Sequence, residues 1–154
     1  MITLRDMNEE EFENYRSLFI NEYALDLQKN REYLSDKARI TAVEAIDTML
    51  TQGVTTPANQ LWCIQKLDEP EEVIGFLWLS ITGPSAWVSD FYIYSKWRNR
   101  GLGSLALSEM KKWLKVMGIN EVGLRVAPEN ASAKVLYEKK GFRITGINMS
   151  QNLN

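Results

Sequence analysis

The sequence predicts an α/β fold in which helices flank a mixed, mostly antiparallel sheet. Two amphipathic helical patterns come first, three strand-like runs joined by short turns follow, and a strand–helix–strand unit comes next. Strands joined by short turns pair antiparallel, whereas a strand–helix–strand crossover joins parallel strands and is right-handed. The expected order of elements is β-α-α-β-β-β-α-β-α-β.

The first third of the chain predicts one short strand, Thr3–Arg5, and two helices. Asn8 and Glu11 have the spacing of a capping box, which opens the first helix. Aromatic residues then recur at helical steps, at Phe12, Tyr15, Phe19 and Tyr23. The second helix begins at Ser35 or Asp36 and ends near Gly53; its apolar residues are Ile40, Val43, Ile46, Met49 and Leu50. We interpret Glu22 and Asp26 on the first helix as part of a solvated face.

The middle of the chain predicts a three-stranded antiparallel meander. Its runs are rich in β-branched and aromatic residues, and the turn-forming segments LDEPEE and TGPS separate them. The runs are Leu61–Lys66, Val73–Ile81 and Trp87–Tyr94. Aromatic residues in such runs are usually core residues, but those that face a cleft can line a pocket; the candidates are Trp62, Trp78, Trp87 and Tyr92.

The last third predicts two helices and two strands. They are a helix Gly101–Met117, a strand Glu121–Val126, a short helix that Asn130 caps and Gly141 ends, and a final strand Phe142–Met149. No repeat, linker or low-complexity segment divides the sequence. We therefore expect residues 1–154 to form a single domain.

Composition excludes several classes of function. A net charge of −2 and a pI near 5.3 argue against nucleic-acid binding, because phosphate backbones require a basic surface. The acidic start contains no signal-peptide pattern and no apolar run long enough to span a membrane, so we expect a cytoplasmic protein with no membrane partner. We interpret the single Cys63 as a buried structural thiol.

The chain contains no histidine, which removes the commonest metal ligand and the usual general base near neutral pH. We therefore expect no metal site. Any general base must be a carboxylate, a tyrosine or a water molecule.

The segment RNRGLG, residues 98–103, lies between a predicted strand and a predicted helix. A helix N-terminus attracts anions, and glycines at 101 and 103 leave room for a phosphate near its amides. Ser104-Leu105 after the second glycine rules out a P-loop, which requires Lys-Ser or Lys-Thr there. The segment does match a dinucleotide pattern, but the polar SKWRNR stretch stands where that fold has a tight turn.

Two motifs together resemble the GNAT superfamily of N-acetyltransferases. RNRGLG fits the Arg/Gln-x-x-Gly-x-Gly/Ala signature, and NASAKVLYEKKGF resembles the second signature of that family. Their separation and the order of elements agree with the family. The resemblance is sharpest over Trp87–Phe142 and only topological over Met1–Thr56.

The resemblance implies acetyl-CoA as the donor. The amides of Asn99, Arg100, Gly101, Leu102, Gly103 and Ser104 would wrap the pyrophosphate, with the Arg98 and Arg100 side chains beside it. The strands Trp87–Tyr94 and Glu121–Val126 would splay, leaving open edge groups at Phe91, Tyr92 and Ile93 for the pantetheine arm. Asn130 would contact that arm, and an amide near Ile93 would polarise the thioester carbonyl.

Two residues are the catalytic candidates. Tyr137 matches the family tyrosine that protonates the departing thiolate; its alternative role is helix packing. Asp90 is the only carboxylate in the central strand, and aromatic neighbours could raise its pKa. We predict Asp90 to be the general base or the residue that positions a water molecule; the alternatives are a structural hydrogen bond at the strand end or binding of the substrate ammonium. Some branches of the family instead have a glutamate at the position of Trp87 or of Arg125, and neither residue is acidic here.

The sequence thus predicts an N-acetyltransferase that moves an acetyl group from acetyl-CoA to a primary amine by direct attack in a ternary complex. The alternative is a non-catalytic acyl-CoA-binding or regulatory module on the same fold. The acceptor is a small-molecule or peptide amine that the sequence does not identify. A homodimer stays open as an alternative to a monomer.

Overall fold

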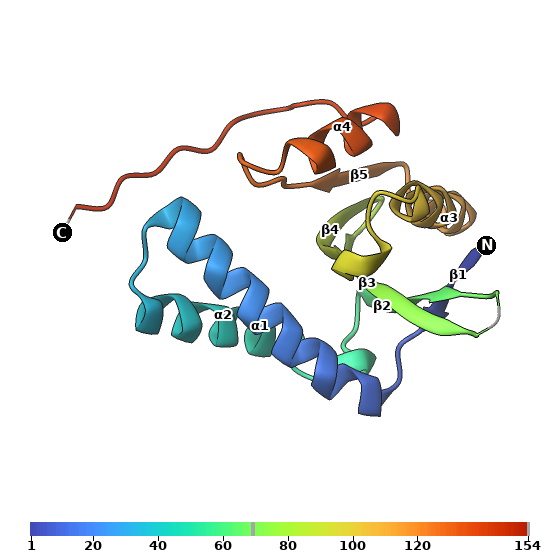
Figure 1. The fold of residues 1–154 in the computed structure, drawn as a ribbon, viewed down its shortest axis with the longest axis horizontal. Coiled ribbons are helices and arrows are strands. Elements are labelled where there is room, and N and C mark those ends of the chain that lie inside the picture. Colours follow the sequence, from blue (N-terminus) through green and yellow to red (C-terminus); the bar gives the residue numbers. More distant parts are fainter. Residues whose placement is uncertain (69, 154) are drawn as a thin grey trace.

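The computed structural model describes residues 1–68 and 70–153 (Figure 1). Its strands are β1 (Ile2–Asp6), β2 (Asn59–Lys66), β3 (Glu72–Thr82), β4 (Ser85–Ile93) and β5 (Glu121–Leu124). Its α-helices are α1 (Glu9–Arg31), α2 (Ser35–Met49), α3 (Leu102–Val116) and α4 (Ala131–Lys139), and 3-10 turns lie at Gly53–Thr55 and Ser95–Trp97. In this described part of the chain, we find no helix with both the length and the apolar content that crossing a bilayer requires.

The strands form one five-stranded sheet in the order β1-β2-β3-β4-β5. The first four strands pair antiparallel, and β4 and β5 pair parallel. The prediction of a mixed sheet with one parallel pair is confirmed. Helix α3 is the connection that makes this pair parallel, because it returns the chain to the starting end of β4 before β5 begins.

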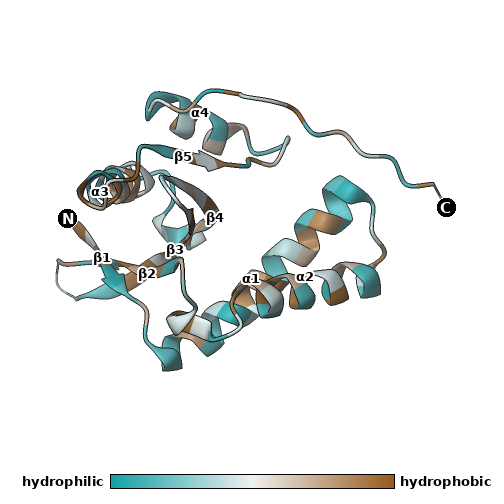
Figure 2. Cartoon of the chain, turned by 180° about the vertical axis from the view of Figure 1, so that it is seen from behind, coloured by the Kyte–Doolittle hydropathy of each residue, from teal (hydrophilic) through white to brown (hydrophobic). Residues whose placement is uncertain are grey.

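Apolar residues pack on both faces of the sheet (Figures 1 and 2). Helices α1 and α2 cover one face, where Tyr15, Phe19 and Ile46 pack against Phe76 and Trp78. Helix α3 covers the other face; its residues Ala106, Leu107, Met110 and Leu114 pack against Leu77, Leu79 and Val88. Each face of the sheet therefore has its own apolar core. Because successive side chains of a strand point to opposite faces, neighbouring strand residues contribute to different cores.

The predicted capping box at the start of α1 is confirmed. The Asn8 side chain accepts a hydrogen bond from the Glu11 amide at 2.7 Å, and the Glu11 carboxylate accepts one from the Asn8 amide at 3.0 Å. The same carboxylate binds the Arg5 guanidinium through both oxygens, at 3.1 and 2.7 Å. These contacts join β1 to α1 and fix the direction in which α1 leaves the sheet.

Cys63 is buried in β2, which confirms its interpretation as a structural thiol. Burial raises the pKa of the Cys63 thiol to about 12, so that the side chain stays protonated at neutral pH.

The prediction of a last strand, Phe142–Met149, is wrong. The residues after α4 form no strand within the part of the chain that the structure describes. They run outward from α4 and end far from the N-terminus (Figures 1 and 2). A strand needs a neighbour with which to share backbone hydrogen bonds, and this segment leaves the domain before it meets one.

Candidate active site

A bulge in β4 decides which of its side chains face the site. Trp78 of β3 pairs with Asp90, but the next residue, Leu79, pairs with Val88, so Ser89 is an extra residue in β4. Side chains alternate between the two faces of a strand, and an extra residue reverses that alternation. As a result, Val88 faces α3 while Asp90, two residues later, faces α1.

The parallel strands part at this bulge. Val88 and Leu124 are their last paired residues. Tyr94 donates its amide to the Ile74 carbonyl of β3 at 2.9 Å, so alternation directs the amide of Ile93 to the opposite, open edge. A cleft of about 1240 Å³ lies at this divergence and extends from α1 to the first turn of α3 and along α4.

Asp90 lies on the α1 wall of the cleft. Its carboxylate accepts a hydrogen bond of 2.7 Å from the hydroxyl of Tyr15, a fully buried residue. Loss of water contact raises the pKa of Asp90 to about 6, and the charge of Glu22 acts in the same direction, whereas the Tyr15 hydroxyl and the Phe91 amide oppose the shift. The carboxyl group can therefore accept or release a proton near neutral pH.

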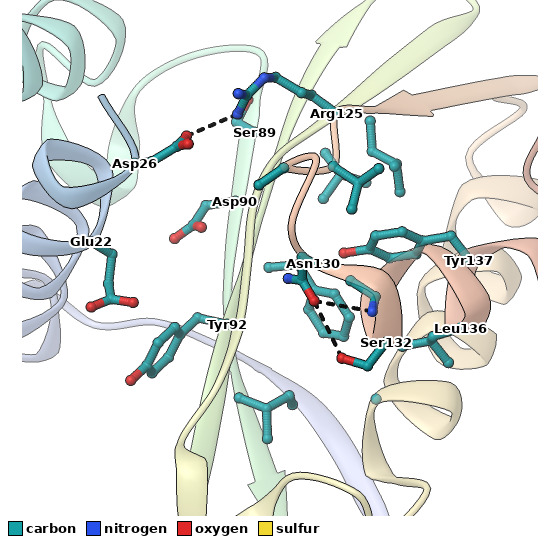
Figure 3. A pocket seen from close by; sticks show the side chains of 18 of the residues that line it. Glu22, Asp26, Ser89, Asp90, Tyr92, Arg125, Asn130, Ser132, Leu136 and Tyr137 are labelled. Atoms are coloured by element: carbon teal, nitrogen blue, oxygen red, sulfur yellow. Dashed lines mark hydrogen bonds and ion pairs between the residues drawn. The ribbon is translucent and has the colours of Figure 1, made fainter. Parts of the chain in front are cut away.

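Tyr137 lies on α4, on the wall of the cleft opposite Asp90 (Figure 3). Its ring packs against Phe91 and Phe142, with centroid separations of 6.4 and 5.8 Å. Burial raises the pKa of Tyr137 to about 12, and the negative charge of Asp90 adds to the shift. The hydroxyl group therefore keeps its proton at neutral pH and can donate it.

Asn130 caps α4, as the sequence predicts. Its side-chain oxygen accepts hydrogen bonds from the Ala133 amide at 3.1 Å and from the Ser132 hydroxyl at 3.3 Å (Figure 3). All three residues line the cleft. The cap occupies the oxygen of Asn130, so its amide NH₂ group is the part that can bind a ligand.

The loop before α3 closes the other end of the cleft. Asn99 and Gly101 both have left-handed backbone conformations, with φ of 61° and 78°, and α3 begins directly after them. Arg98 donates from Nε to the Ile93 carbonyl at 2.6 Å and stacks its guanidinium over Tyr92 at 5.1 Å. These contacts attach the loop to the open end of β4.

The cleft brings together most of the residues that the sequence predicted for the site. The ones that line it are Asp90, Phe91, Tyr92, Ile93, Arg98, Asn99, Gly101, Gly103, Ser104, Asn130 and Tyr137. Two predicted residues lie outside this lining. Arg100 stacks on Trp97 at 5.1 Å, and Leu102, the first residue of α3, is partly buried against the apolar core on that face of the sheet.

The two glycines of the loop differ in their surroundings. A Cβ atom at Gly101 would meet nothing within 4 Å, whereas one at Gly103 would lie 3.2 Å from Leu136 and 3.5 Å from the Phe91 ring. Gly103 therefore lets α4 and β4 pack closely against α3. The role of Gly103 in leaving space for a phosphate stays a prediction.

Glu22 is exposed, in agreement with the interpretation of this pair as a solvated face, whereas Asp26 is only partly exposed; both side chains line the cleft (Figure 3). Asp26 forms an ion pair with Arg125 at 2.8 Å, from α1 to the segment after β5. No ion pair forms at Glu22 among the residues that the structure describes. Glu22 and Asp26 are four residues apart, so they lie on one helix face, and this spacing was the sequence signal that could have placed them together.

The four aromatic candidates divide between core and cleft. Trp62 lies on the α3 face, where it packs edge-on against Trp113 at 5.0 Å, and is outside the cleft. Trp87 and Tyr92 line the cleft, and Trp78 borders it while being fully buried in the core. Trp87 is 48% exposed and lies over Gly123, where an added Cβ would come within 2.9 Å of the ring.

The sheet, the divergent parallel pair and the glycine loop before α3 define a class of acetyltransferase. The chain belongs to the acetyltransferase (GNAT) family, whose model matches residues 7–142. It is 31% identical to an uncharacterised N-acetyltransferase of Bacillus subtilis, YycN, over 156 residues that cover 99% of each chain. The crystal structure of YycN superposes with a TM-score of 0.90 at 30% identity, covering 100% of this chain and 99% of that one.

Two further relatives extend the comparison. The uncharacterised N-acetyltransferase YdgE of Bacillus subtilis is 28% identical over 155 residues, or 98% of each chain. The PaiA N-acetyltransferase of Thermoplasma acidophilum, solved in complex with coenzyme A, superposes with a TM-score of 0.71 over 96% of this chain and 93% of its own. At 20% identity, PaiA shows likeness of fold alone.

Proposed function

We propose that the protein transfers the acetyl group of acetyl-CoA to a primary amine by direct attack in a ternary complex. The observation that carries the proposal is the placement of Asp90 and Tyr137 on opposite walls of one cleft, where β4 and β5 diverge. Amine attack on a thioester needs a proton acceptor on one side of the reacting carbon and a proton donor on the other. The raised pKa values of the two residues suit these two roles.

Acetyl-CoA supplies the acetyl group as a thioester. The loop at residues 98–104 and the first amides of α3 offer the anion site that its pyrophosphate needs. The open edge of β4 beyond Val88 offers backbone groups to which the pantetheine arm can add as a strand, and the amide of Ile93 lies on that edge. The coenzyme A that PaiA binds on the same fold supports this assignment.

The proton transfers of the reaction are assigned to Asp90 and Tyr137, which lie on opposite walls of the cleft. An alkyl ammonium with a pKa near ~10.4 gives up one proton to Asp90, directly or through a water molecule, and the free nitrogen attacks the carbonyl carbon. The C–N bond forms as the C–S bond breaks, and Tyr137 protonates the departing sulfur. The nitrogen releases its second proton to solvent, and Tyr137 is reprotonated from solvent. Asp90 then gives to solvent the proton that it took from the ammonium, so that one net proton is released per turnover.

Charge on the α1 wall favours a cationic acceptor. Glu22 and Asp90 both present carboxyl groups to the cleft, and the charge of Glu22 acts on Asp90. Asp26 is already neutralised by Arg125, so Glu22 is the carboxylate available to a second positive group of the substrate. We assign the acceptor to amines that carry a further cation or hydrogen-bond donor beyond the reacting nitrogen.

An amine panel with acetyl-CoA, read by thiol release and by the mass of the acetylated product, tests the function. We expect stoichiometric release of thiol and acetylated product with at least one cationic amine. CoA binding is measured in parallel by calorimetry. Tight CoA binding without turnover on any amine would instead support a non-catalytic acyl-CoA module, and absence of CoA binding would contradict both functions.

A further inference from the structure

Trp87 differs from the other four tryptophans of the chain in its surroundings. Its indole lines the cleft and is 48% exposed, and within residues 1–68 and 70–153 this side chain makes no hydrogen bond, aromatic pair or cation–π contact. The others either donate an indole hydrogen bond, as Trp78 and Trp97 do, or pack edge-on in a pair, as Trp62 and Trp113 do. A large aromatic ring left open in a cleft is a contact surface for a ligand.

Trp87 lies on the same face of the sheet as Asp90. Ser80 of β3 pairs with Trp87, and Trp78, two residues earlier on β3, pairs with Asp90. Residues two apart on a strand share a face, and so do directly paired residues on neighbouring strands. Trp78 packs against Phe19 of α1, so this is the face that α1 covers. The backbone positions of Trp87 and Asp90 are therefore about 7 Å apart along the sheet, which is the rise of two strand residues.

Gly123 lets the ring of Trp87 lie against β5. The two residues are directly paired in the parallel ladder, and a Cβ atom at position 123 would lie 2.9 Å from Cζ3 of the ring and 3.0 Å from Cε3. A side chain at this position would therefore push the indole away from the strand. The glycines with positive φ do not include Gly123, so the space that the ring needs, and not the backbone conformation, accounts for a glycine here.

The charges beside the ring favour an apolar ligand group over a cation. Arg125 follows Gly123 by two residues, and its guanidinium forms an ion pair with Asp26 of α1 at 2.8 Å (Figure 3). A cation on the ring would approach this like charge, and the carboxylate beside it is already paired. An aromatic or branched aliphatic group meets no such repulsion. Met49, which is 45% exposed, adds a further apolar surface to the same cleft.

We propose that Trp87 determines which acceptors the protein uses, by stacking an aromatic or branched aliphatic group of the acceptor on its ring while the reacting nitrogen lies at Asp90. Gly123 is a positioning residue that keeps the ring against β5. This inference rests on the proposed function and names its substrate class. The acceptor is a primary amine that carries both a polar group for Glu22 and an apolar side chain for Trp87.

A series of acceptors that differ in one group tests the role of Trp87. Alanine amide, leucine amide and phenylalanine amide share a primary α-amine and a carboxamide donor and differ only in the side chain. We expect kcat/KM of the wild type to be at least about 10-fold higher for phenylalanine amide than for alanine amide. Trp87→Ala should bring this ratio close to one, whereas Trp87→Phe should retain part of it. Ile40→Ala is the control, because Ile40 is exposed on α2 outside the cleft lining, and it should keep the full ratio.

Gly123→Ala separates the position of the ring from its presence. The indole remains, but the new Cβ atom displaces it, so the ratio of kcat/KM should fall at least about 3-fold. Trp87→Ala/Gly123→Ala should have the same ratio as Trp87→Ala, because no ring is left to displace. Thermal melts establish that each variant is folded. An unchanged ratio in folded Gly123→Ala overturns the positioning role of Gly123.

Calorimetry keeps failure of this inference distinct from failure of the proposed function. Each amide is titrated into the protein in the presence of coenzyme A, which reports acceptor affinity without turnover. Tighter binding of phenylalanine amide that Trp87→Ala abolishes, without any acetylation, supports the role of Trp87 and contradicts acetyl transfer. Equal kcat/KM for all three amides, or a preference that survives Trp87→Ala, overturns the role of Trp87 and leaves acetyl transfer standing. A protein that neither binds nor acetylates any of the amides overturns the substrate class.

Discussion

Burial raises the pKa of both Asp90 and Tyr137, although we propose opposite roles for the two residues. Loss of water contact disfavours the charged form of each group, so the pKa of both is raised. A carboxyl group with a pKa of about 6 accepts a proton more readily than an ordinary aspartate, yet it is still ionised at pH 7. A phenol with a pKa of about 12 keeps its proton until sulfur leaves.

We expect Tyr137→Phe to lower kcat by about 10²-fold, because it removes the proton donor and keeps the ring that packs against Phe91. CoA affinity should barely change. Steady-state kinetics and a CoA titration of the same preparation measure both quantities. Wild-type turnover in the folded variant would remove Tyr137 from the mechanism.

Glu22→Gln should raise the KM for a dicationic acceptor about 10-fold and leave kcat nearly unchanged, because it removes the free carboxylate on the α1 wall. Glu44→Gln is the control, since Glu44 is exposed on α2 and lies outside the cleft lining. The effect should shrink as salt is added. Equal KM values for the two variants would argue against Glu22 as an acceptor contact.

At the scale of elements, the bulge in β4 explains why part of the site could not be predicted. The sequence indicated Asp90 as the carboxylate of the central strand, but strict alternation from Val88 would have turned it towards α3. Ser89 reverses that alternation, and Tyr15 then becomes the partner of Asp90. The sequence showed Tyr15 only as one of four aromatic residues on a helix. Helical periodicity indicates which residues share a helix face, but it does not indicate which strand residue that face contacts.

Gly103 supplies a test of how α3, β4 and α4 pack. We expect Gly103→Ala to gain less than the ~1 kcal/mol by which alanine ordinarily stabilises a helix over glycine, because its new Cβ would approach Leu136 to 3.2 Å. Leu136→Ala should make room for that methyl group, so the double variant should be more stable than the sum of the single effects predicts. Thermal melts of all four proteins measure this coupling. Strict additivity would show that the two residues do not compete for space.

At the scale of the molecule, patterning predicted the sheet well and the chain end poorly. The meander and the crossover follow from alternation, turn chemistry and one amphipathic helix, all of which are local signals. The segment after Gly141 carries an equally good strand pattern, yet a strand also needs an edge, and the position of that edge is a property of the assembled sheet. The motifs predicted the residues of the glycine loop and of α4 that line the cleft, whereas the positions of Glu22 and Asp26 depended on how α1 lies across the cleft from the segment after β5.

The buried carboxyl group should make the stability of the whole protein depend on pH. The pKa of Asp90 is about 6 in the folded state and near 3.8 when unfolded, so its stabilising effect is complete below pH 3.8 and is lost as pH rises through 6. We expect Asp90→Asn to gain on the order of 2 kcal/mol relative to wild type between pH 4 and pH 7. Urea unfolding at several pH values measures the difference. A difference that is independent of pH would contradict the raised pKa.

The pH–rate profile of Asp90→Asn, with a cationic amine that the wild type acetylates, tests the central claim most directly. If Asp90 accepts the amine proton, kcat/KM of the variant should fall about 10²-fold at pH 7 and recover as rising pH supplies free amine. The wild type should show an ionisation near pH 6 that the variant lacks, and Tyr15→Phe should move that ionisation to higher pH, because it removes a hydrogen bond to the ionised carboxylate. A variant profile parallel to that of the wild type from pH 6 to pH 10 would contradict the claim and assign the proton to a group other than Asp90.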